Sequence, residues 1–448
     1  MCGIIGIYNH PEASTVAYLG LHALQHRGQE SAGIVTAEDG NLHQHKAMGL
    51  VADVFNKKIL QNLRGVSAIG HVRYSTYGES DLKNAQPFFV KYGFGSVAVC
   101  HNGNITNADE LKSELEGNGA IFHTTMDTEV VMHLISHSKQ QDLADKITDA
   151  LKKVVGAYNL IFLSKDKMII VRDPNGFRPL VLGKLNKSYV VASETCSFDL
   201  IDAEFEREVK PGELIVLDKD GAHSFFPFEK VEKINQCIFE YIYFARPDSQ
   251  IFGRGGVYEM RKGFGRQLAI ENPVEADVVV PVPDSGVPAA IGYARQSGIP
   301  FEKGLVRSHY VGRTFIEPSD EIRNFGVKLK LNPVQDVLKN KRVILIDDSI
   351  VRGTTSKKIV NMVRRAGASE IHVRISSPPT ICPCFYGIDT PTKEELIASS
   401  KNVDEICEHI GADSLKYLSQ NGLYWFEKQS SREWYCDACF TGQYPTKI

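Results

Sequence analysis

The chain has 448 residues, of which 43% are hydrophobic and 23% are charged, and its formal net charge is −3. This length predicts two or three domains with ample core, and the near-neutral charge argues against a general attraction for nucleic acid. No stretch approaches the roughly 18 uninterrupted apolar residues that span a membrane, and no secretory signal opens the chain. A cytoplasmic location is therefore expected.

The first predicted element begins with a cysteine. We expect Met1 to be removed before the small Cys2 side chain, which leaves a free α-amine beside the Cys2 thiol. An α-amine with a pKa of about 8 can take a proton from a neighbouring nucleophile. Residues 2–8 have the pattern of a buried strand, so the thiol would begin a rigid element. A cysteine at this position alone, however, more often has no catalytic role.

Residues 2 to about 230 are rich in short apolar strands that end at Gly and Asn turns. Helical patterns near residues 16–24 and 143–154 interrupt these strands. Runs of strands with helices between them predict packed antiparallel sheets flanked by helices. The predicted strands include residues 68–74, 97–100, 159–163 and 189–192.

From about residue 240 the pattern changes. Residues 277–282 and 343–346 are apolar strands, and each is followed by a helical pattern with one apolar face. This alternation predicts a parallel, doubly wound sheet. Residues from about 393 onwards have the pattern of an amphipathic helical tail that ends in a cysteine pair.

The strongest motif lies at residues 343–356. Asp347 and Asp348 leave a buried strand, and a Gly/Thr/Ser turn then opens a helix. Backbone N–H groups and hydroxyls at a helix N-terminus bind phosphate, while the acids suit ribose hydroxyls or Mg²⁺. The alternative is that Asp348 is a turn residue and Thr354 a helix cap. The turn and helix start contribute Ser349, Arg352, Gly353, Thr354 and Thr355 as candidate ligands.

A second turn precedes this motif. Asp284, Ser285 and Gly286 follow a strand and open a helix, although a plain strand-to-helix turn has the same pattern. Between the two motifs, a basic stretch that includes Arg313 and Lys328 has the character of a lid over a polyphosphate. A solvated surface loop is the alternative.

These motifs resemble known families. Residues 343–356 resemble the signature of type I phosphoribosyltransferases, in which the turn at 284–286 matches a pyrophosphate-binding turn. The N-terminal half resembles class II, N-terminal-nucleophile glutamine amidotransferases, and the whole chain resembles the glutamine phosphoribosylpyrophosphate amidotransferases. The amidotransferase motifs are residues 2–4, 24–29, 70–76, 101–104 and 127–129.

The resemblance implies an α+β N-terminal-nucleophile sandwich (αββα) in residues 2–235. An α/β type I phosphoribosyltransferase domain would follow in residues 236–405, and residues 406–448 would form a helical tail. The implied reaction is the first committed step of purine synthesis. Glutamine, phosphoribosyl pyrophosphate and water give 5-phosphoribosylamine, glutamate and pyrophosphate, with ammonia passed between two sites.

The same resemblance implies roles for the amidotransferase residues. Cys2 attacks the glutamine carboxamide, and Asn102 with the Gly103 N–H forms the oxyanion hole. Arg73 holds the substrate carboxylate and Asp127 receives its ammonium group. From the residues alone, Asn102-Gly103 could be a hairpin turn, Asp127 a helix cap and Arg73 a surface charge.

In the second domain, the resemblance implies that Ser285, Asp347 and Asp348 hold Mg²⁺. It also implies inhibition by purine nucleotides and a homotetramer. Two other classes remain open: a different amidotransferase, such as a sugar-phosphate aminating enzyme or an asparagine synthetase, and a non-enzymatic sensor of phosphoribosyl pyrophosphate. The phosphoribosyltransferase motif argues against the first, and the intact Cys2 set argues against the second.

Four cysteines form a further set. Cys436 and Cys439 make a C-x-x-C pair, which alone could be redox-active, zinc-binding or part of an iron–sulfur site. Cys237 precedes Ile-Phe-Glu and Cys384 lies in Pro-Cys-Phe-Tyr-Gly, as in the branch of the family that carries a [4Fe–4S] cluster. The resemblance therefore implies a cluster on these four residues. A zinc site or buried thiols are the alternatives. Cys382 lies close to Cys384 and could be mistaken for the ligand. The remaining cysteines, Cys100, Cys196 and Cys407, are expected in the core.

The chain departs from the family pattern in three places. Many cluster-bearing relatives begin with a propeptide, whereas here Cys2 follows Met1 directly, so methionine removal alone should mature the enzyme. Glu317 and Asp320 stand in the expected lid where glutamines are usual, and acids are unfavourable near a polyphosphate. Glu30 replaces a common aspartate, which is a mild change.

Overall fold

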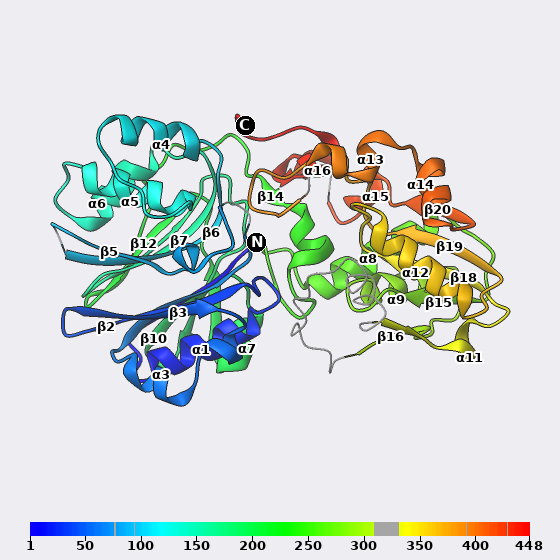
Figure 1. The fold of residues 1–448 in the computed structure, drawn as a ribbon, viewed down its shortest axis with the longest axis horizontal. Helices are drawn as coiled ribbons and strands as arrows, with labels where there is room; N and C mark the ends of the chain where they lie inside the picture. The colour runs from blue at the N-terminus through cyan, green and yellow to red at the C-terminus, as the bar shows by residue number, and fades with distance from the viewer. Residues whose placement is uncertain (76–77, 94, 309–330, 391, 428) are drawn as a thin grey trace.

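The computed structural model describes all 448 residues except 76–77, 94, 309–330, 391 and 428. The expected lid residues Arg313, Glu317, Asp320 and Lys328 therefore lie outside the described residues. Figure 1 shows two halves side by side, with the N-terminal half in blue to green on the left and the second half in green to red on the right.

Two antiparallel sheets build the first half. The seven-stranded sheet has the order β11-β9-β10-β1-β4-β2-β3, and the six-stranded sheet has the order β13-β12-β8-β7-β6-β5. The first sheet contains β1 (Gly3–Tyr8), β2 (Ser31–Glu38), β3 (Asn41–Met48), β4 (Ser67–Arg73), β9 (Val181–Leu185), β10 (Ser188–Ala192) and β11 (Glu204–Glu208). The second contains β5 (Phe88–Tyr92), β6 (Gly95–Ile105), β7 (Gly156–Leu163), β8 (Met168–Arg172), β12 (Leu214–Asp218) and β13 (Gly221–Phe225).

Side-chain alternation explains how the sheets are layered. In β1, Ile4 belongs to the apolar core between the sheets, while Ile5 and Ile7 pack toward the helices on the outer face. The outer helices of the first sheet are α1 (Ala13–Ala23), α2 (Val51–Val54), α3 (Lys57–Asn62) and α7 (Cys196–Ile201). The second sheet is covered by α4 (Ala108–Gly117), α5 (Asp127–His137) and α6 (Leu143–Leu151). The predicted αββα sandwich is confirmed (Figure 1).

The second half contains a parallel four-stranded sheet in the order β15-β18-β19-β20. Its strands are β15 (Val278–Pro281), β18 (Arg342–Asp347), β19 (Glu370–Ile375) and β20 (Ser414–Tyr417). In β18, Ile344 and Ile346 pack toward one set of helices, and Val343 and Leu345 pack toward the other. These sets are α8 (Val257–Glu271) with α9 (Val287–Ser297), and α12 (Thr354–Arg365) with α14 (Val403–Ile410). The predicted doubly wound sheet is confirmed.

The C-terminal segment differs from the expected helical tail. The expected boundary at residue 405 falls inside α14, and β20 completes the parallel sheet. Because β20 has only four residues, its sequence is too short to distinguish a strand from one face of a helix. We therefore propose that the second domain extends to about residue 418. The remaining helices in this half are η2 (Glu240–Phe244, a π-helix), α11 (Gln335–Leu338), η3 (Lys393–Glu395), α13 (Ile397–Ser400), α15 (Gln420–Leu423), η4 (Gln429–Trp434) and α16 (Ala438–Thr441).

Two small sheets complete the fold. β14 (Gln236–Cys237) pairs in parallel with β21 (Tyr435–Cys436), which brings the end of the chain back to the junction between the halves. β16 (Leu305–Arg307) pairs with β17 (Leu331–Pro333). In the first half, the short helix η1 (Leu82–Asn84) precedes β5.

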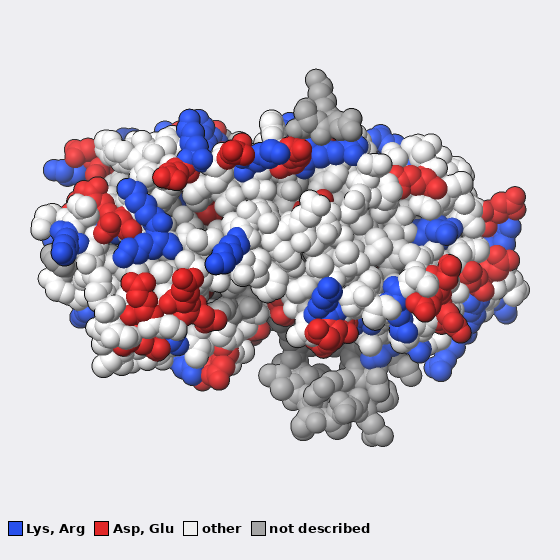
Figure 2. Space-filling model, turned by 90° about the horizontal axis from the view of Figure 1, so that it is seen from above, with Lys and Arg blue, Asp and Glu red and all other residues white. Residues whose placement is uncertain are grey.

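The surface carries both signs of charge. In Figure 2, basic and acidic side chains are interspersed over both halves, and the middle of this face is largely uncharged. No helix among the described residues has both the length and the apolar character needed to cross a membrane.

Candidate active sites

Cys2 immediately precedes β1, the central strand of the seven-stranded sheet. Its side chain is buried, and its thiol lies 3.7 Å from the carbonyl oxygen of Tyr74. Its backbone N–H donates to Oδ1 of Asn102 at 3.3 Å. Because Asn102 belongs to the other sheet, this contact places the cysteine between the two layers of the sandwich.

Asn102 and Gly103 lie within β6, not at a hairpin turn, so the turn alternative is wrong. The Nδ2 of Asn102 is buried and donates to no partner among the described residues. Gly103 has φ +155°, and a Cβ there would lie 2.0 Å from the carbonyl oxygen of Ala157. The result is an unpaired amide donor next to Cys2, on a strand where only glycine fits at residue 103.

Arg73 ends β4 and is 3% exposed, which makes the surface-charge alternative wrong. Its Nη1 donates to Ser75 Oγ at 2.7 Å and to the Glu79 carbonyl oxygen at 3.1 Å. The Glu30 carboxylate lies 3.7 Å from the same nitrogen and also accepts from the Ser75 backbone N–H. The Glu30 substitution noted in the sequence therefore keeps a carboxylate beside Arg73.

Asp127 is the first residue of α5, and Met126 rather than Asp127 occupies the N-cap. It instead accepts the Ile105 N–H of β6 at 3.0 Å and lies 3.3 Å from Nδ1 of His101. Burial alone would raise the pKa of Asp127, but the charge and hydrogen bond of His101 hold it below its usual value. The helix-cap alternative is therefore wrong, because this buried carboxylate is fixed to a neighbouring strand.

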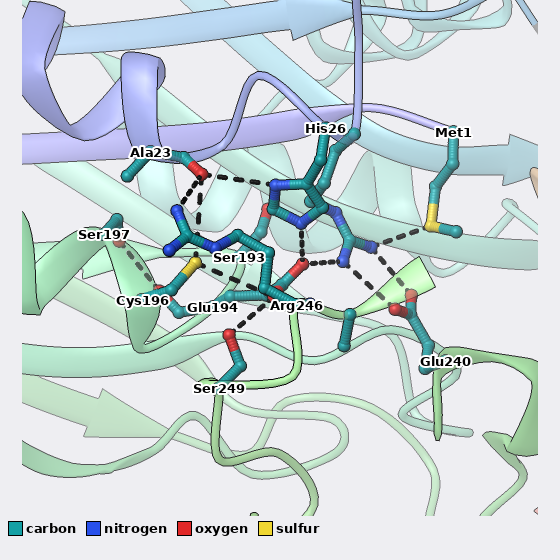
Figure 3. Close-up of polar contacts among 12 residues, drawn as sticks. Met1, Ala23, His26, Ser193, Glu194, Cys196, Ser197, Glu240, Arg246 and Ser249 are labelled. Atoms are coloured by element: carbon teal, nitrogen blue, oxygen red, sulfur yellow. Dashed lines mark hydrogen bonds and ion pairs between the residues drawn. The ribbon is translucent and has the colours of Figure 1, made fainter. Parts of the chain in front are cut away.

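A buried ionic network adjoins Cys2, and sequence reasoning had assigned no role to its members. Arg27 donates Nε to the Cys2 carbonyl oxygen at 3.0 Å and is paired with Glu194 and Glu240. Figure 3 shows Glu194 and Glu240 on opposite sides of this network, with His26 and Met1 beside it. Burial alone would raise the pKa of Glu194, but His26 and Arg27 hold it well below its usual range. Two sequence features point to this network. Arg27 lies in the 24–29 motif, and Glu240 ends the Ile-Phe-Glu run that follows Cys237.

In the second half, the two expected phosphate turns lie side by side. β15 and β18 are parallel neighbours with Pro281 opposite Ile346, so the turns that follow them meet at one edge of the sheet. A Cβ on Gly286 would lie 2.4 Å from the Ile346 carbonyl oxygen, so a residue with a side chain would clash with the neighbouring strand at this position. Asp284, in the same turn, is paired with Arg307 at 2.6 Å. Ser285 lies between Asp284 and Gly286 in this turn.

Asp347 and Asp348 stand at the end of β18. The Asp348 N–H donates to Asp347 Oδ1 at 2.9 Å, and the Ser349 hydroxyl donates to Asp348 Oδ1 at 2.7 Å. Burial and the neighbouring Asp348 carboxylate raise the pKa of Asp347 well above its usual range. Two adjacent carboxylates with hydroxyl neighbours are hard oxygen donors of the kind that suits Mg²⁺. The donor set therefore fits the expected ion.

The turn after these acids leads into α12. Gly353 occupies the N-cap with φ +77° and Thr354 is already the first residue of α12, so the alternative of a Thr354 cap is wrong. Thr354 and Thr355 are exposed at the first turn of the helix. Arg352 is exposed and lies 3.3 Å from Glu395. Hydroxyls and backbone N–H groups are thus free to meet an anion at this helix start.

The four expected cluster cysteines come together at the junction of the halves. Cys237 pairs in register with Cys436, and the Cys439 carbonyl oxygen accepts the N–H of Cys382, two residues before Cys384. Burial, together with the Cys237 and Cys384 thiols, raises the pKa of Cys436 and Cys439 well above the usual range. Four thiols brought together from remote parts of the chain have the donor chemistry of a [4Fe–4S] cluster, so these residues fit one.

No group of three or more His, Cys, Asp and Glu side chains in the described part of the chain could hold a single metal ion. A [4Fe–4S] cluster is a different case, since its cysteines bind different irons. Of the other cysteines, Cys100 and Cys196 are buried in the core as expected, while Cys407 is only partly buried.

One further residue adjoins the second candidate site. Tyr243 in η2 is 49% exposed, and partial burial together with the charges of Asp348, Asp347 and Tyr74 raises the pKa of its phenol. It lines a pocket of about 280 Å³ that reaches from Ser349 to Cys384. The Tyr243 side chain therefore stands beside the turn that follows the acid pair and beside the loop that carries Cys384.

The fold and the two sites define a class of protein, a glutamine amidotransferase joined to a phosphoribosyltransferase. Residues 71–199 match the family described as "Glutamine amidotransferase domain". Amidophosphoribosyltransferase 1, chloroplastic, from Arabidopsis thaliana is 58% identical over all of this chain and 79% of its own length. The chain belongs to the amidophosphoribosyltransferase family, and it is an enzyme of the first committed step of purine biosynthesis.

Two solved structures agree with this assignment. The structure described as the allosteric regulatory enzyme of purine biosynthesis is 51% identical, with a TM-score of 0.95 over 100% of this chain and 97% of that one. The glutamine phosphoribosylpyrophosphate amidotransferase from B. subtilis, complexed with ADP and GMP, is 50% identical, with a TM-score of 0.94 over 100% and 98% of the two chains.

Proposed function

We propose that Cys2 carries out the glutamine half of the family reaction. After removal of Met1, the Cys2 thiol attacks the glutamine carboxamide and its α-amine takes the thiol proton. The C–N bond then breaks, ammonia leaves with that proton, and water hydrolyses the remaining thioester to glutamate and the free thiol. Arg73 would pair with the substrate carboxylate and Asp127 with its ammonium group.

The observation that carries this proposal is the unpaired Nδ2 of Asn102 beside Cys2. A buried donor without a partner costs free energy, so its retention points to an acceptor that arrives with the substrate. The Asn102 amide and the Gly103 N–H would stabilise the tetrahedral oxyanion. Fixed donors of this kind typically contribute about 3 kcal/mol each to the transition state.

Replacing Asn102 with alanine tests this oxyanion hole. We expect the kcat for glutamine hydrolysis to fall about 100-fold to 1,000-fold, because one donor to the anion is lost. Synthesis of 5-phosphoribosylamine from added ammonia should stay at the wild-type rate, which controls for folding. Wild-type glutaminase activity in this variant would reject the oxyanion role.

For the second half-reaction, we propose that the turn of Asp284, Ser285 and Gly286 binds pyrophosphate. The turn before α12 and the start of that helix would bind the sugar phosphate, through Ser349, Arg352, Gly353, Thr354 and Thr355. Ser285, Asp347 and Asp348 would hold Mg²⁺, which supplies charge stabilisation for the departing pyrophosphate when bound. Arg313 and Lys328, outside the described residues, are proposed to cover the polyphosphate.

The two half-reactions need a connection. Free ammonia would largely protonate in water, so we propose that it passes between the sites inside the protein. The pocket lined by Tyr243 and Ser349 supports this proposal, because it lies beside the turn that follows the acid pair.

We also propose that Cys237, Cys384, Cys436 and Cys439 bind one [4Fe–4S] cluster. The support is their convergence at the domain junction, where Cys237 pairs in register with Cys436 and the Cys439 carbonyl oxygen accepts the N–H of Cys382. Four thiolates from remote parts of the chain would fix the C-terminal segment to the body.

The cluster proposal predicts brown protein with about four irons per chain after anaerobic purification. Cys384→Ser should remove the iron and lower the thermal unfolding midpoint. Cys382→Ser, two residues away, is the matched control and should keep both the iron and the wild-type unfolding midpoint. Iron content and the visible spectrum give the answer, and colourless protein with one zinc per chain would contradict the cluster.

Regulation and assembly are proposed from the relatives. The B. subtilis structure contains ADP and GMP, and we propose that purine nucleotides inhibit this enzyme as well. We further propose a homotetramer and a cytoplasmic location, although the plant relatives are named as chloroplastic proteins. Sedimentation of the purified chain tests the tetramer.

A further inference from the structure

The loop that carries Cys384 contacts the strand that carries the proposed oxyanion hole. Asn104 follows Gly103 in β6, and its Nδ2 donates to the Phe385 carbonyl oxygen at 2.9 Å across 281 residues of sequence. The Oδ1 of Asn104 is buried and accepts no hydrogen bond from the described residues. The amide of Asn104 is therefore oriented by the second domain.

A second contact joins the same two segments. Gly387 has φ +98°, and a Cβ there would lie 2.8 Å from the carbonyl carbon of Gly103 and 2.9 Å from its oxygen. The backbone of the Cys384 loop thus lies directly against the backbone of Gly103. Any side chain at residue 387 would push on the glycine whose N–H is proposed to bind the oxyanion.

The loop itself is held firmly. Arg178 is fully buried and donates Nε and Nη2 to the Tyr386 carbonyl oxygen at 3.2 and 2.6 Å. The Tyr386 ring stacks on Phe177 with a centroid separation of 4.2 Å. Arg178 is in turn paired with Glu240 at 3.4 Å, and Glu240 pairs with the Arg27 that contacts Cys2. A rigid support therefore stands behind β6.

We propose that the Phe385–Gly387 loop of the second domain sets the position of the oxyanion donors, and that Asn104 is a positioning residue for glutamine hydrolysis. This inference rests on the proposed role of Asn102 and Gly103. The position of the loop affects the rate because an oxyanion donor is effective only near 3 Å from the anion. A displacement of about 1 Å can lower the rate about 100-fold. The first domain would then depend on the second for its catalytic geometry.

Asn104→Asp tests the inference, because it keeps the size of the side chain but removes the donor and repels the Phe385 carbonyl oxygen. We expect the kcat of glutamine hydrolysis to fall about 10-fold, since the donors shift without being lost. The KM for glutamine should change less than about 2-fold, because substrate binding uses other residues. Ammonia-dependent synthesis should stay at the wild-type rate. Asn104→Ala removes the same contact without adding a charge and should give the same loss of kcat.

Asn107→Asp is the matched control. The Asn107 side chain also donates to a backbone carbonyl, that of Lys153 at 2.9 Å, and accepts the Val155 N–H at 2.9 Å, so both of these contacts lie within the first domain. This variant should have wild-type kinetics. Gly387→Ala, which presses on Gly103 from the other side, should lower kcat while the KM for glutamine is retained.

Wild-type kcat in Asn104→Asp and Asn104→Ala would overturn the inference, as would an equal loss of glutamine-dependent and ammonia-dependent activity. Failure of the underlying proposal gives a different result. If Asn102→Ala itself hydrolyses glutamine normally, the oxyanion assignment is wrong, whatever the Asn104 variants do.

Discussion

Replacing Cys2 with alanine is expected to abolish the glutamine-dependent formation of 5-phosphoribosylamine and to leave the ammonia-dependent formation close to wild type. The thiol is the only proposed nucleophile of the first site, whereas the second site lies on the other half of the molecule (Figure 1). Both activities are measured as pyrophosphate release, first with glutamine and then with ammonium at a pH where free ammonia is present.

Cys2→Ser is a useful companion, because a hydroxyl fills the space of the thiol but is a far weaker nucleophile at neutral pH. It should also lose glutamine-dependent activity. Joint loss of both activities in a folded variant would contradict two separate sites, and retained glutamine-dependent activity would reject Cys2 as the nucleophile.

Removing either charge of the acid pair is expected to have the next largest effect. Asp347→Asn and Asp348→Asn should each lower transferase activity at least about 100-fold, because charge stabilisation at a phosphate site is lost. Binding of phosphoribosyl pyrophosphate should weaken, and basal glutamine hydrolysis should survive. Calorimetric titration with phosphoribosyl pyrophosphate and Mg²⁺ measures the affinity, and a glutamate assay measures the hydrolysis.

Asp336→Asn is the matched control for these variants, since Asp336 is an exposed carboxylate of α11 in the same half. It should retain wild-type binding and rate. If both variants of the acid pair bind phosphoribosyl pyrophosphate as tightly as the wild type, the proposed carboxylate role is wrong.

The parts of the site predicted well from sequence are those whose signals are local. β18 is a run of apolar residues that stops at Asp347, and this pattern was enough to place the acids at the edge of a parallel sheet. The alternation of apolar and turn segments in the first half likewise predicted the sandwich. Here the local pattern and the tertiary structure agree.

Other parts depend on contacts between distant residues. Arg27 and Glu240 are 213 residues apart, so their pairing leaves no periodic signal in the sequence. Asn102-Gly103 has the composition of a hairpin turn, yet β6 continues through it because Gly103 packs against Ala157 and pairs with β7. Tertiary contacts override the local preference at this position.

The most direct measurement of the central claim is the stoichiometry of the two products. With glutamine, phosphoribosyl pyrophosphate and Mg²⁺ present together, we expect glutamate and pyrophosphate to form in equal amounts. Glutamate formation should be slower when phosphoribosyl pyrophosphate is omitted. Glutamate formed at the same rate in both conditions, without pyrophosphate, would contradict the account of two coupled sites on one chain.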